Sequence, residues 1–112
     1  MISHRQGDTL IVSIKGELDH HTAEIARDRL DSLLEDKSLK NMVVDLSHLK
    51  FMDSSGIGVF IGRYKKLSER MGKLGAYGLN NHIRKIWEIS GLHRIIDIYD
   101  NLEESLNGIQ EV

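Results

Sequence analysis

Cysteine and proline are both absent from the 112 residues of the sequence. Without cysteine the chain can form no disulfide, no thiolate nucleophile and no cysteine-based zinc site, which fits a protein of the reducing cytosol. Without proline, the ends of helices must be set by capping residues and glycines. We therefore expect a cytoplasmic protein that carries out no redox chemistry and needs no cofactor.

A strong charge of either sign is lacking as well. The 15 Lys and Arg residues are balanced by 17 Asp and Glu residues, which leaves a formal net charge of -2. Such a chain has no global field that would draw it onto nucleic acid or an anionic membrane. The longest uncharged run near the middle, residues 54–62, is about half as long as a membrane span, and no stretch of signal-peptide character opens the sequence. We expect a soluble protein with no nucleic-acid or membrane partner.

Length and composition fit one domain over residues 1–112. Domains usually span about 100 to 200 residues, and 40% hydrophobic with 29% charged residues is typical of a globular protein. No linker, repeat or low-complexity tract divides the chain. A chain of this size also offers little room for a lidded substrate pocket.

Hydrophobic periodicity predicts an alternation of short strands and helices. Period-2 patterns indicate strands, and apolar positions recurring at steps of three and four indicate amphipathic helices. Asn80 or Asn81 should cap the third helix and Gly91 should end it, while Asp100 with Glu103 resembles a capping box for the last helix. The predicted elements are a hairpin over 2–15, helices over about 22–34, 54–71, 80–90 and 100–109, and strands over 42–46, 74–79 and 95–98. This order predicts an α/β fold whose sheet is mostly parallel after the first hairpin.

The segment Asp53-Ser54-Ser55-Gly56 at the start of the second helix is the most informative. Asp and Ser cap helices because their side-chain oxygens accept the unpaired amides of the first turn. A cap does not explain the second serine, nor Gly56, Gly58 and Gly62 inside the helix, each of which costs about 1 kcal/mol relative to Ala. Such losses suggest that something comes close to the backbone. The exposed hydroxyl could be a nucleophile, part of a phosphate-binding corner, or an acceptor for phosphorylation.

Catalysis and nucleotide binding find little support in this segment. The Gly-x-Ser-x-Gly elbow of hydrolases is missing, and the glycine pattern is one residue off the dinucleotide fingerprint. No Gly-Lys-Ser/Thr phosphate loop occurs anywhere in the chain.

A second polar corner precedes the first helix and carries Asp19, His20, His21, Thr22 and Glu24. Asp followed by two histidines could begin a metal site, but hydrolases need further ligands, and only Asp45 and Asp53 lie at suitable strand ends. The simpler interpretation is that Asp19 caps the helix while the histidines are solvated. We favour the cap and keep a small metal-dependent phosphoesterase, using Asp19, His20, His21 and Asp53, as the alternative from another class.

These two corners closely resemble the STAS-domain anti-sigma factor antagonists, most closely those of the sporulation pathway. Four segments carry the resemblance: GELDHHTAE at 16–24, LKFMDSSGIG at 49–58, GRYK at 62–65 and SGL at 90–92. Their order and spacing cover the chain from about residue 8 to 100. An antagonist from a stress-response pathway is the other alternative within the family.

The resemblance implies a STAS-like fold, with a mixed sheet of four to five strands flanked by four helices, and no catalytic or metal-binding residues. Such proteins bind an anti-sigma factor that is also a serine kinase, and so release the sigma factor. The kinase phosphorylates the serine that follows the Asp of the motif, here Ser54, and a PP2C-type serine phosphatase restores it. We expect partner contacts from residues at both corners, with the two glycines letting a partner approach the helix: Asp19, His20, Thr22, Asp53, Ser55, Gly56 and Gly58.

Overall fold

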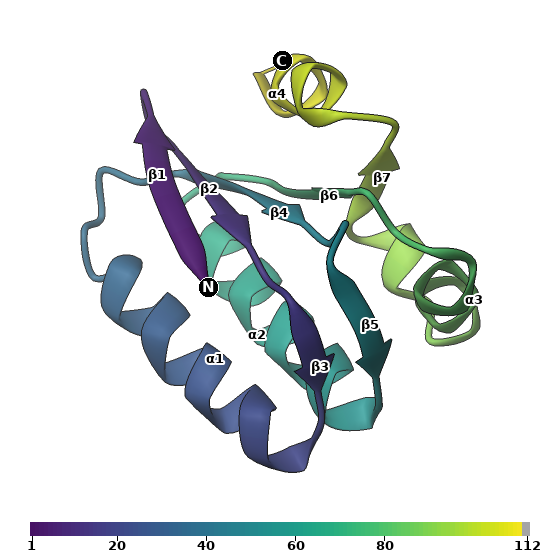
Figure 1. Ribbon diagram of the computed structural model, residues 1–112. Helices are drawn as coiled ribbons and strands as arrows, with labels where there is room; N and C mark the ends of the chain where they lie inside the picture. The colour runs from purple at the N-terminus through teal and green to yellow at the C-terminus, as the bar shows by residue number, and fades with distance from the viewer. Residues whose placement is uncertain (111–112) are drawn as a thin grey trace.

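A mixed five-stranded sheet lies at the centre of the computed structural model, which describes residues 1–110 (Figure 1). Across the sheet the strands are β1 (Ile2–Gln6), β2 (Thr9–Ser13), β4 (Asn41–Asp45), β6 (Leu74–Tyr77) and β7 (Asp97–Tyr99). β1 runs antiparallel to β2, and the other neighbouring pairs are parallel. A separate parallel pair consists of β3 (Gly16–Leu18) and β5 (Leu49–Met52). The predicted α/β class, with a mixed sheet of four to five strands, is confirmed.

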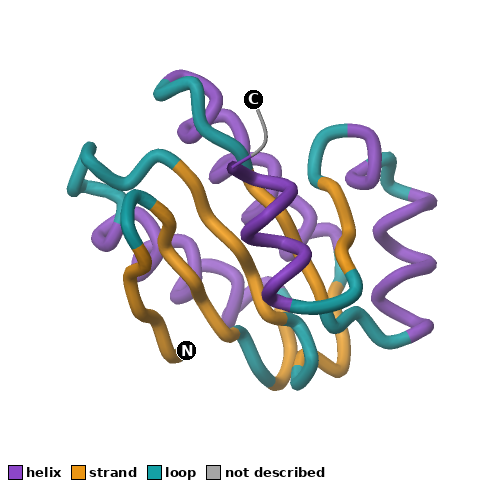
Figure 2. Tube along the Cα trace, turned by 90° about the horizontal axis from the view of Figure 1, so that it is seen from above, coloured by secondary structure: helices purple, strands orange, loops and turns teal. Residues whose placement is uncertain are grey.

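Helices cover both faces of the sheet. They are α1 (His20–Leu33), α2 (Ser54–Glu69), α3 (Asn81–Ile89) and α4 (Leu102–Gln110), with a short 3-10 helix, η1 (Leu92–Arg94), after α3. α1 and α2 lie side by side on one face, whereas α4 crosses the other face (Figures 1 and 2). α3 packs beside β5. Within residues 1–110, no helix has the length and apolar character needed to cross a bilayer.

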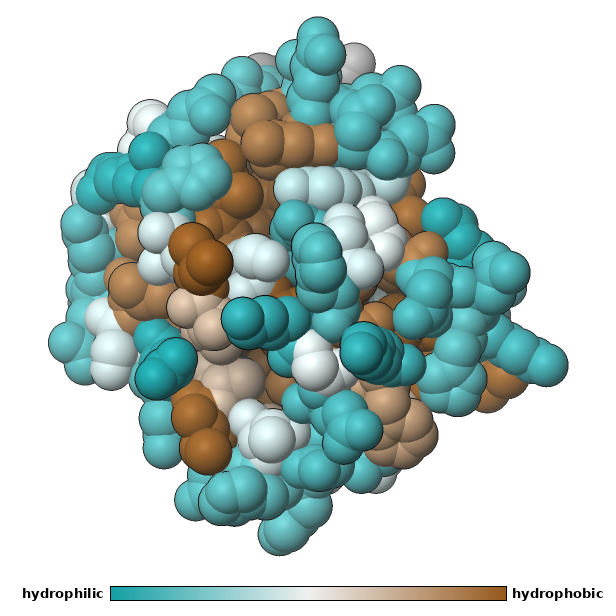
Figure 3. Space-filling model, in the orientation of Figure 1, coloured by the Kyte–Doolittle hydropathy of each residue, from teal (hydrophilic) through white to brown (hydrophobic). Residues whose placement is uncertain are grey.

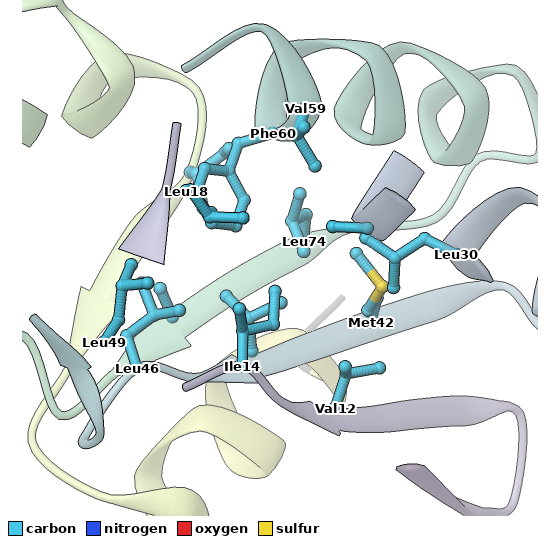
Figure 4. Packing of buried hydrophobic residues seen from close by; sticks show 14 of the residues in the cluster. Val12, Ile14, Leu18, Leu30, Met42, Leu46, Leu49, Val59, Phe60 and Leu74 are labelled. Carbon is cyan, nitrogen blue, oxygen red and sulfur yellow. The ribbon is translucent and has the colours of Figure 1, made fainter. Parts of the chain in front are cut away.

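The alternation of side chains along the strands divides the core into two parts. Val12 on β2 and Val44 on β4 belong to the main cluster, which fills the space between the sheet, α1 and α2 (Figure 4). Their neighbours Ile11 and Val43 point to the other face, where Ile109 of α4 covers them. Because successive residues of a strand point to opposite faces, a nearly continuous apolar run such as 42–46 identifies a strand covered on both sides.

The boundaries near the C-terminus differ from the prediction. The last strand begins at Asp97, whereas Ile95 and Ile96 lie in the turn before it, where Ile96 is fully buried in the main core. The last helix is capped by Asn101, whose side chain accepts the Glu104 amide at 2.8 Å, so the predicted capping box from Asp100 is wrong by one residue. Gly91 does end α3 as predicted, with a left-handed φ of 83°.

Gly72 comes three residues after the end of α2. The left-handed position after this helix is taken by Met71, with a φ of 61°. A Cβ on Gly72 would lie 1.5 Å from the carbonyl oxygen of Lys40. Gly72 is therefore required by the close approach of two backbone segments, and not by the helix end.

Candidate functional site

The starts of α1 and α2 lie next to each other because their preceding strands are paired. In the parallel pair of β3 and β5, Leu18 is aligned with Met52. Each strand is followed by an aspartate that caps the next helix, Asp19 for α1 and Asp53 for α2. The Asp53 amide donates to the Leu18 carbonyl at 3.2 Å, which ties the two corners together. The two corners that were expected to contact a partner therefore adjoin.

Asp19 makes the more complete cap. Its Oδ1 accepts the amides of His21 at 3.0 Å and Thr22 at 2.9 Å, and the Thr22 hydroxyl oxygen accepts the Asp19 amide at 2.9 Å. The same hydroxyl lies 2.8 Å from the Glu17 carbonyl oxygen. Hydrogen bonds from the backbone and then the side chain of Thr22 hold the pKa of Asp19 below its ordinary value. Asp19 thus presents an ionised carboxylate. The main structural role of Thr22 is to complete the helix cap.

The Asp53 cap leaves the serine hydroxyls unused. Asp53 Oδ1 accepts the Ser55 amide at 2.8 Å. Ser54 is the first residue of α2 and is exposed, whereas Ser55 is half-buried. Among residues 1–110, nothing hydrogen-bonds to the hydroxyl of Ser54. Of the two serines, Ser54 therefore carries the more accessible hydroxyl.

The glycines of α2 fall into two kinds, which corrects part of the sequence interpretation. Gly56 is buried, and a Cβ there would lie 2.4 Å from Met52 Cγ and 3.0 Å from Leu18 Cβ. Its missing side chain accommodates packing against β3 and β5, and not the approach of a partner. Gly58 and Gly62 have open space where a Cβ would be. The predicted role in letting another molecule approach is retained only for Gly58.

A groove of about 410 Å³ runs between the first turns of α1 and α2. It brings together three of the predicted contact residues, His20, Ser55 and Gly58. Glu24 and Arg27 also line this groove, although neither was predicted to contact a partner. The signal was present, because Glu24 follows His20 by four residues and Arg27 follows by seven, so the three share one face of a helix. Ala23 and Val59 form a buried apolar floor.

An exposed aromatic side chain on the strand that leads to Ser54 was also missed. Phe51 on β5 is 40% exposed, and its ring stacks on that of His82 with centroids 5.9 Å apart. In the sequence, residue 51 stands out only as part of the segment 49–58 that carries the family resemblance. Since β5 was not predicted as a strand, nothing indicated that Phe51 would face outward.

The metal alternative finds no ligand set. Among the described residues, no group of three or more His, Asp or Glu side chains is placed to hold a metal ion. The Asp45 carboxylate accepts both the amide and the hydroxyl of Ser47, at 2.9 Å and 2.6 Å. His20 and His21 are both exposed. The arrangement can present a hydroxyl, two carboxylates and a groove to another molecule. These features are typical of a binding surface.

Comparison with known proteins defines the class to which this surface belongs. Residues 1–105 match the STAS domain family. An anti-sigma F factor antagonist from Paenibacillus polymyxa is 37% identical over 111 residues, covering 99% of this chain and 94% of that protein. An anti-sigma-B factor antagonist from Listeria monocytogenes is 35% identical over 107 residues, covering 96% and 92%. The chain belongs to the STAS domain family, among the anti-sigma factor antagonists, which are regulatory proteins and not enzymes.

Solved structures agree with this assignment. The anti-sigma factor antagonist SpoIIAA in its unphosphorylated form superimposes with a TM-score of 0.84 at 25% identity, covering 99% of this chain and 96% of that one. The phosphorylated form of SpoIIAA from Bacillus superimposes with a TM-score of 0.75, also at 25% identity, covering 97% and 98%. The STAS fold expected from the four sequence segments is confirmed.

Proposed function

We propose that this chain binds an anti-sigma factor that is also a serine kinase, thereby releases a sigma factor in the cytoplasm, and is switched off by phosphorylation of Ser54. A PP2C-type serine phosphatase reverses the switch. The observation that carries the proposal is the position of Ser54, exposed and without hydrogen-bond partner among residues 1–110, at the start of α2 beside a second capped corner. The contact surface comprises Asp19, His20, Thr22, Asp53, Ser55 and Gly58.

The fold can accept a phosphate at this position. Phosphorylation adds a charge of about -1.5 to -2, and the start of a helix favours negative charge by about 0.3 to 1 kcal/mol. Ser54 projects from the first turn of α2 and is not part of the core. The existence of SpoIIAA in a phosphorylated form with a similar fold supports the same view.

Binding is expected to be lost on phosphorylation. A phosphate enclosed in an interface without a partner loses several kcal/mol of hydration, and each 1.4 kcal/mol changes affinity about tenfold. The ionised Asp19 and the capping Asp53 lie at the two adjoining corners, so the phosphate would add its negative charge to two nearby carboxylates. A loss of about 3 to 4 kcal/mol would leave the phosphorylated form effectively unbound.

The test begins with the kinase of the same organism and ATP. Mass spectrometry should find phosphate on Ser54 in the wild type and in Ser55→Ala, and none in Ser54→Ala. Affinity for the kinase, measured in one nucleotide state, should fall at least about 100-fold from Ser54→Ala to Ser54→Asp. Equal affinities would contradict the electrostatic account, and phosphate on Ser55 alone would contradict the choice of serine.

The sporulation and stress-response alternatives differ only in the partner. Relatives named for sigma F and for sigma B are similar to this chain to nearly the same degree, 37% and 35%. We favour the sporulation pathway on the resemblance of the two corner motifs. Competition between the two kinds of anti-sigma factor for the purified protein would decide between them, and preference for the stress-response partner would overturn the choice.

A further inference from the structure

Of the Trp, Tyr and Phe residues, all of which lie within residues 1–110, only Phe51 is exposed. Trp87 and Phe60 are fully buried, the tyrosines are half-buried, and Phe51 is 40% exposed. Aromatic side chains are enriched at protein interfaces, where a ring buries a large area at a low cost in conformational entropy. The exposure of Phe51 has a structural cause in β5.

An extra residue in β5 turns the Phe51 ring outward. The register of β5 on β3 skips Lys50, because Leu49 and Phe51 are aligned with consecutive residues of β3. Leu49 and Met52 are buried, whereas Lys50 and Phe51 are exposed. In a regular strand that buries Leu49, Phe51 would point into the core and Met52 would face solvent. The bulge reverses this order, and bulges often re-aim side chains next to functional sites.

His82 holds the exposed ring in place. The rings of Phe51 and His82 are stacked, with centroids 5.9 Å apart and an angle of 17° between their planes. His82 lies in the first turn of α3, and this turn is fixed to β5 because the cap residue Asn80 donates from Nδ2 to the Leu49 carbonyl at 3.1 Å. Ring pairs at such a separation attract each other, and an ordered side chain loses less conformational entropy when a partner binds. Phe51 is therefore a pre-organised apolar group.

Phe51 lies on the same side of the chain as the Asp53 cap. Asp53 follows two residues later, and its backbone is extended, with a φ of -108° and a ψ of -166°. Side chains two residues apart on extended backbone point to the same side, with Cα atoms about 7 Å apart. The Cα atom of Ser54 is three residues from that of Phe51, hence at most about 11 Å away. A typical interface covers about 800 Å² on each partner, and a circle of this area has a radius of about 16 Å. A protein centred on Ser54 therefore reaches Phe51.

The surroundings of Phe51 are polar. Glu17, which is aligned with Phe51 on β3, and Lys50 are exposed, and neither forms an ion pair within residues 1–110. Figure 3, in the orientation of Figure 1, shows a mainly hydrophilic surface with small hydrophobic areas over β3 and β5. We call the surface formed by Glu17, Lys50, Phe51 and His82 the Phe51 surface. An apolar group within a polar rim is typical of the centre of an interface, so this surface fits a partner with an apolar pocket and polar edges.

We propose that Phe51, positioned by His82, is the apolar anchor that inserts into the anti-sigma factor, an inference that rests on the proposed function. The anti-sigma factor is the occupant because the contact surface proposed for it includes Asp53, which follows Phe51 on the same side of the chain. Phe51 provides affinity in the unphosphorylated state. A phosphate on Ser54 prevents the close approach on which insertion of the ring depends.

The experiment measures the affinity of the full unphosphorylated chain for its anti-sigma factor by titration calorimetry. Phe51→Ala should weaken binding at least about tenfold, as truncation of an anchor typically does. The matched control is Ile89→Ala, which removes a side chain that is 77% exposed on α3 and should leave the affinity at the wild-type value. Both variants should keep the circular dichroism spectrum of the wild type, since neither residue belongs to a buried core cluster.

His82 is tested as a positioning residue. His82→Ala should weaken binding about threefold, and His82→Tyr, which keeps a ring against Phe51, should restore most of the loss. In the Phe51→Ala background, His82→Ala should have no further effect, because the ring that it orders is gone. The control His4→Ala removes an exposed imidazole on β1 and should leave the affinity unchanged. A loss that persists in the Phe51→Ala background would overturn the positioning role.

A second measurement does not depend on loss of affinity. In Phe51→Trp, the new indole should shift its fluorescence to shorter wavelength when the anti-sigma factor is added, because the ring leaves water on insertion. Trp87 is fully buried, so the spectrum of the wild-type complex can be subtracted to isolate the signal of the new side chain. An unshifted spectrum in a Phe51→Trp variant that binds would overturn the proposal, even where Phe51→Ala fails to fold.

The possible failures are distinct. If the wild type binds no anti-sigma factor, the proposed function falls and the anchor falls with it. If the wild type binds and Ser54→Asp does not, but Phe51→Ala binds like the wild type, only the anchor is overturned. If Phe51→Ala binds the anti-sigma factor normally and instead slows removal of the phosphate by the phosphatase, the Phe51 surface belongs to that enzyme and the proposal is also overturned.

Discussion

Gly56 packs with its α carbon against the side chain of Met52, so closely that a Cβ would lie 2.4 Å from Met52 Cγ. Met52 ends β5 and Gly56 belongs to the first turn of α2, so this contact sets the angle at which the helix leaves the strand. The position of Ser54 between them depends on that angle. Gly56 was first interpreted as part of the contact surface. Its role is instead to pack beneath that surface, against the strand that leads to Ser54.

Gly56→Ala should destabilise the fold although alanine is the better helix former. Relief of the glycine penalty offers about 1 kcal/mol, but overpacking against Met52 and Leu18 costs about 1 to 3 kcal/mol. We expect a net decrease in the free energy of unfolding, measured by urea titration. Gly58→Ala is the matched control, since its Cβ enters open space and should raise that free energy by up to about 1 kcal/mol. Equal effects of the two substitutions would contradict the packing role of Gly56.

Gly58→Arg should weaken binding to the anti-sigma factor kinase without unfolding the chain. The new side chain would project into the groove between α1 and α2, where Gly58 lies beside His20 and Ser55. Filling a groove of about 410 Å³ removes the space that the partner is proposed to enter. The measurements are affinity by titration and the circular dichroism spectrum, which should stay near wild type. A folded variant that binds normally would exclude the groove from the interface, and a variant that unfolds would assign Gly58 a role in packing instead.

Much of this fold follows from local patterns in the sequence. The caps at Asp19, Asp53 and Asn80 were predicted because a short polar side chain before an apolar period satisfies the free amides of a helix. β5 was missed because its two central residues, Lys50 and Phe51, are both exposed, which breaks the period-2 pattern. The pairing of β3 with β5 shifts register between Gly16 and Glu17, an irregularity that only the folded pair reveals.

The candidate site was also predicted in part from local sequence patterns. Asp19, His20, Thr22, Asp53 and Ser55 lie near one another because two motifs distant in the chain follow paired strands. The distinction between Gly56 and Gly58 could not be made from sequence, since both are glycines in one helix and differ only in what packs against them. The choice of Ser54 over Ser55 came from the family motif, and the greater exposure of Ser54 agrees with it.

The contribution of Asp19 to stability should disappear in acid. Its pKa is lowered in the fold from the ordinary 3.8, chiefly by the hydrogen bond from the Thr22 amide. The folded state therefore holds this proton less tightly than the unfolded state, so the contribution is complete above 3.8 and is lost as the pH falls through the lower folded value. Asp19→Ala should be less stable than wild type at neutral pH, and the difference should shrink towards about pH 2.

Asp19→Asn provides the matched comparison for this titration. Asparagine retains an oxygen that can cap the helix but carries no ionisable group, so its stability relative to Asp19→Ala should not depend on acid in this range. Urea titrations of the three proteins at a series of pH values give the differences directly. A wild-type advantage over Asp19→Ala that persists unchanged in strong acid would show that the ionised carboxylate is not the source of the stabilisation.

Asp31 should stabilise the contact between α1 and α2 by balancing a buried arginine. Arg63 is 6% exposed, its Nε lies 3.2 Å from Asp31 Oδ1, and its Nη1 is buried with no hydrogen-bond partner among residues 1–110. Lys66 Nζ approaches the same oxygen at 3.0 Å. Burial lowers the pKa of Arg63, and the Asp31 carboxylate opposes that shift. Removing the carboxylate takes away the one oxygen that both cations approach.

We expect Asp31→Asn to lower the free energy of unfolding by about 1 to 3 kcal/mol, less than for a fully buried pair because Asp31 is about one-third exposed. Arg63→Met should be neutral or stabilising, since replacing a buried ion pair with apolar packing often is. In the Arg63→Met background, Asp31→Asn should lose most of its effect, and a double-mutant cycle measured by urea titration gives the coupling. An effect of Asp31→Asn that is the same in both backgrounds would mean that Arg63 is not its cause. Because these two helices carry Asp19 and Ser54 at their starts, loss of this coupling should also loosen the groove at the proposed contact surface.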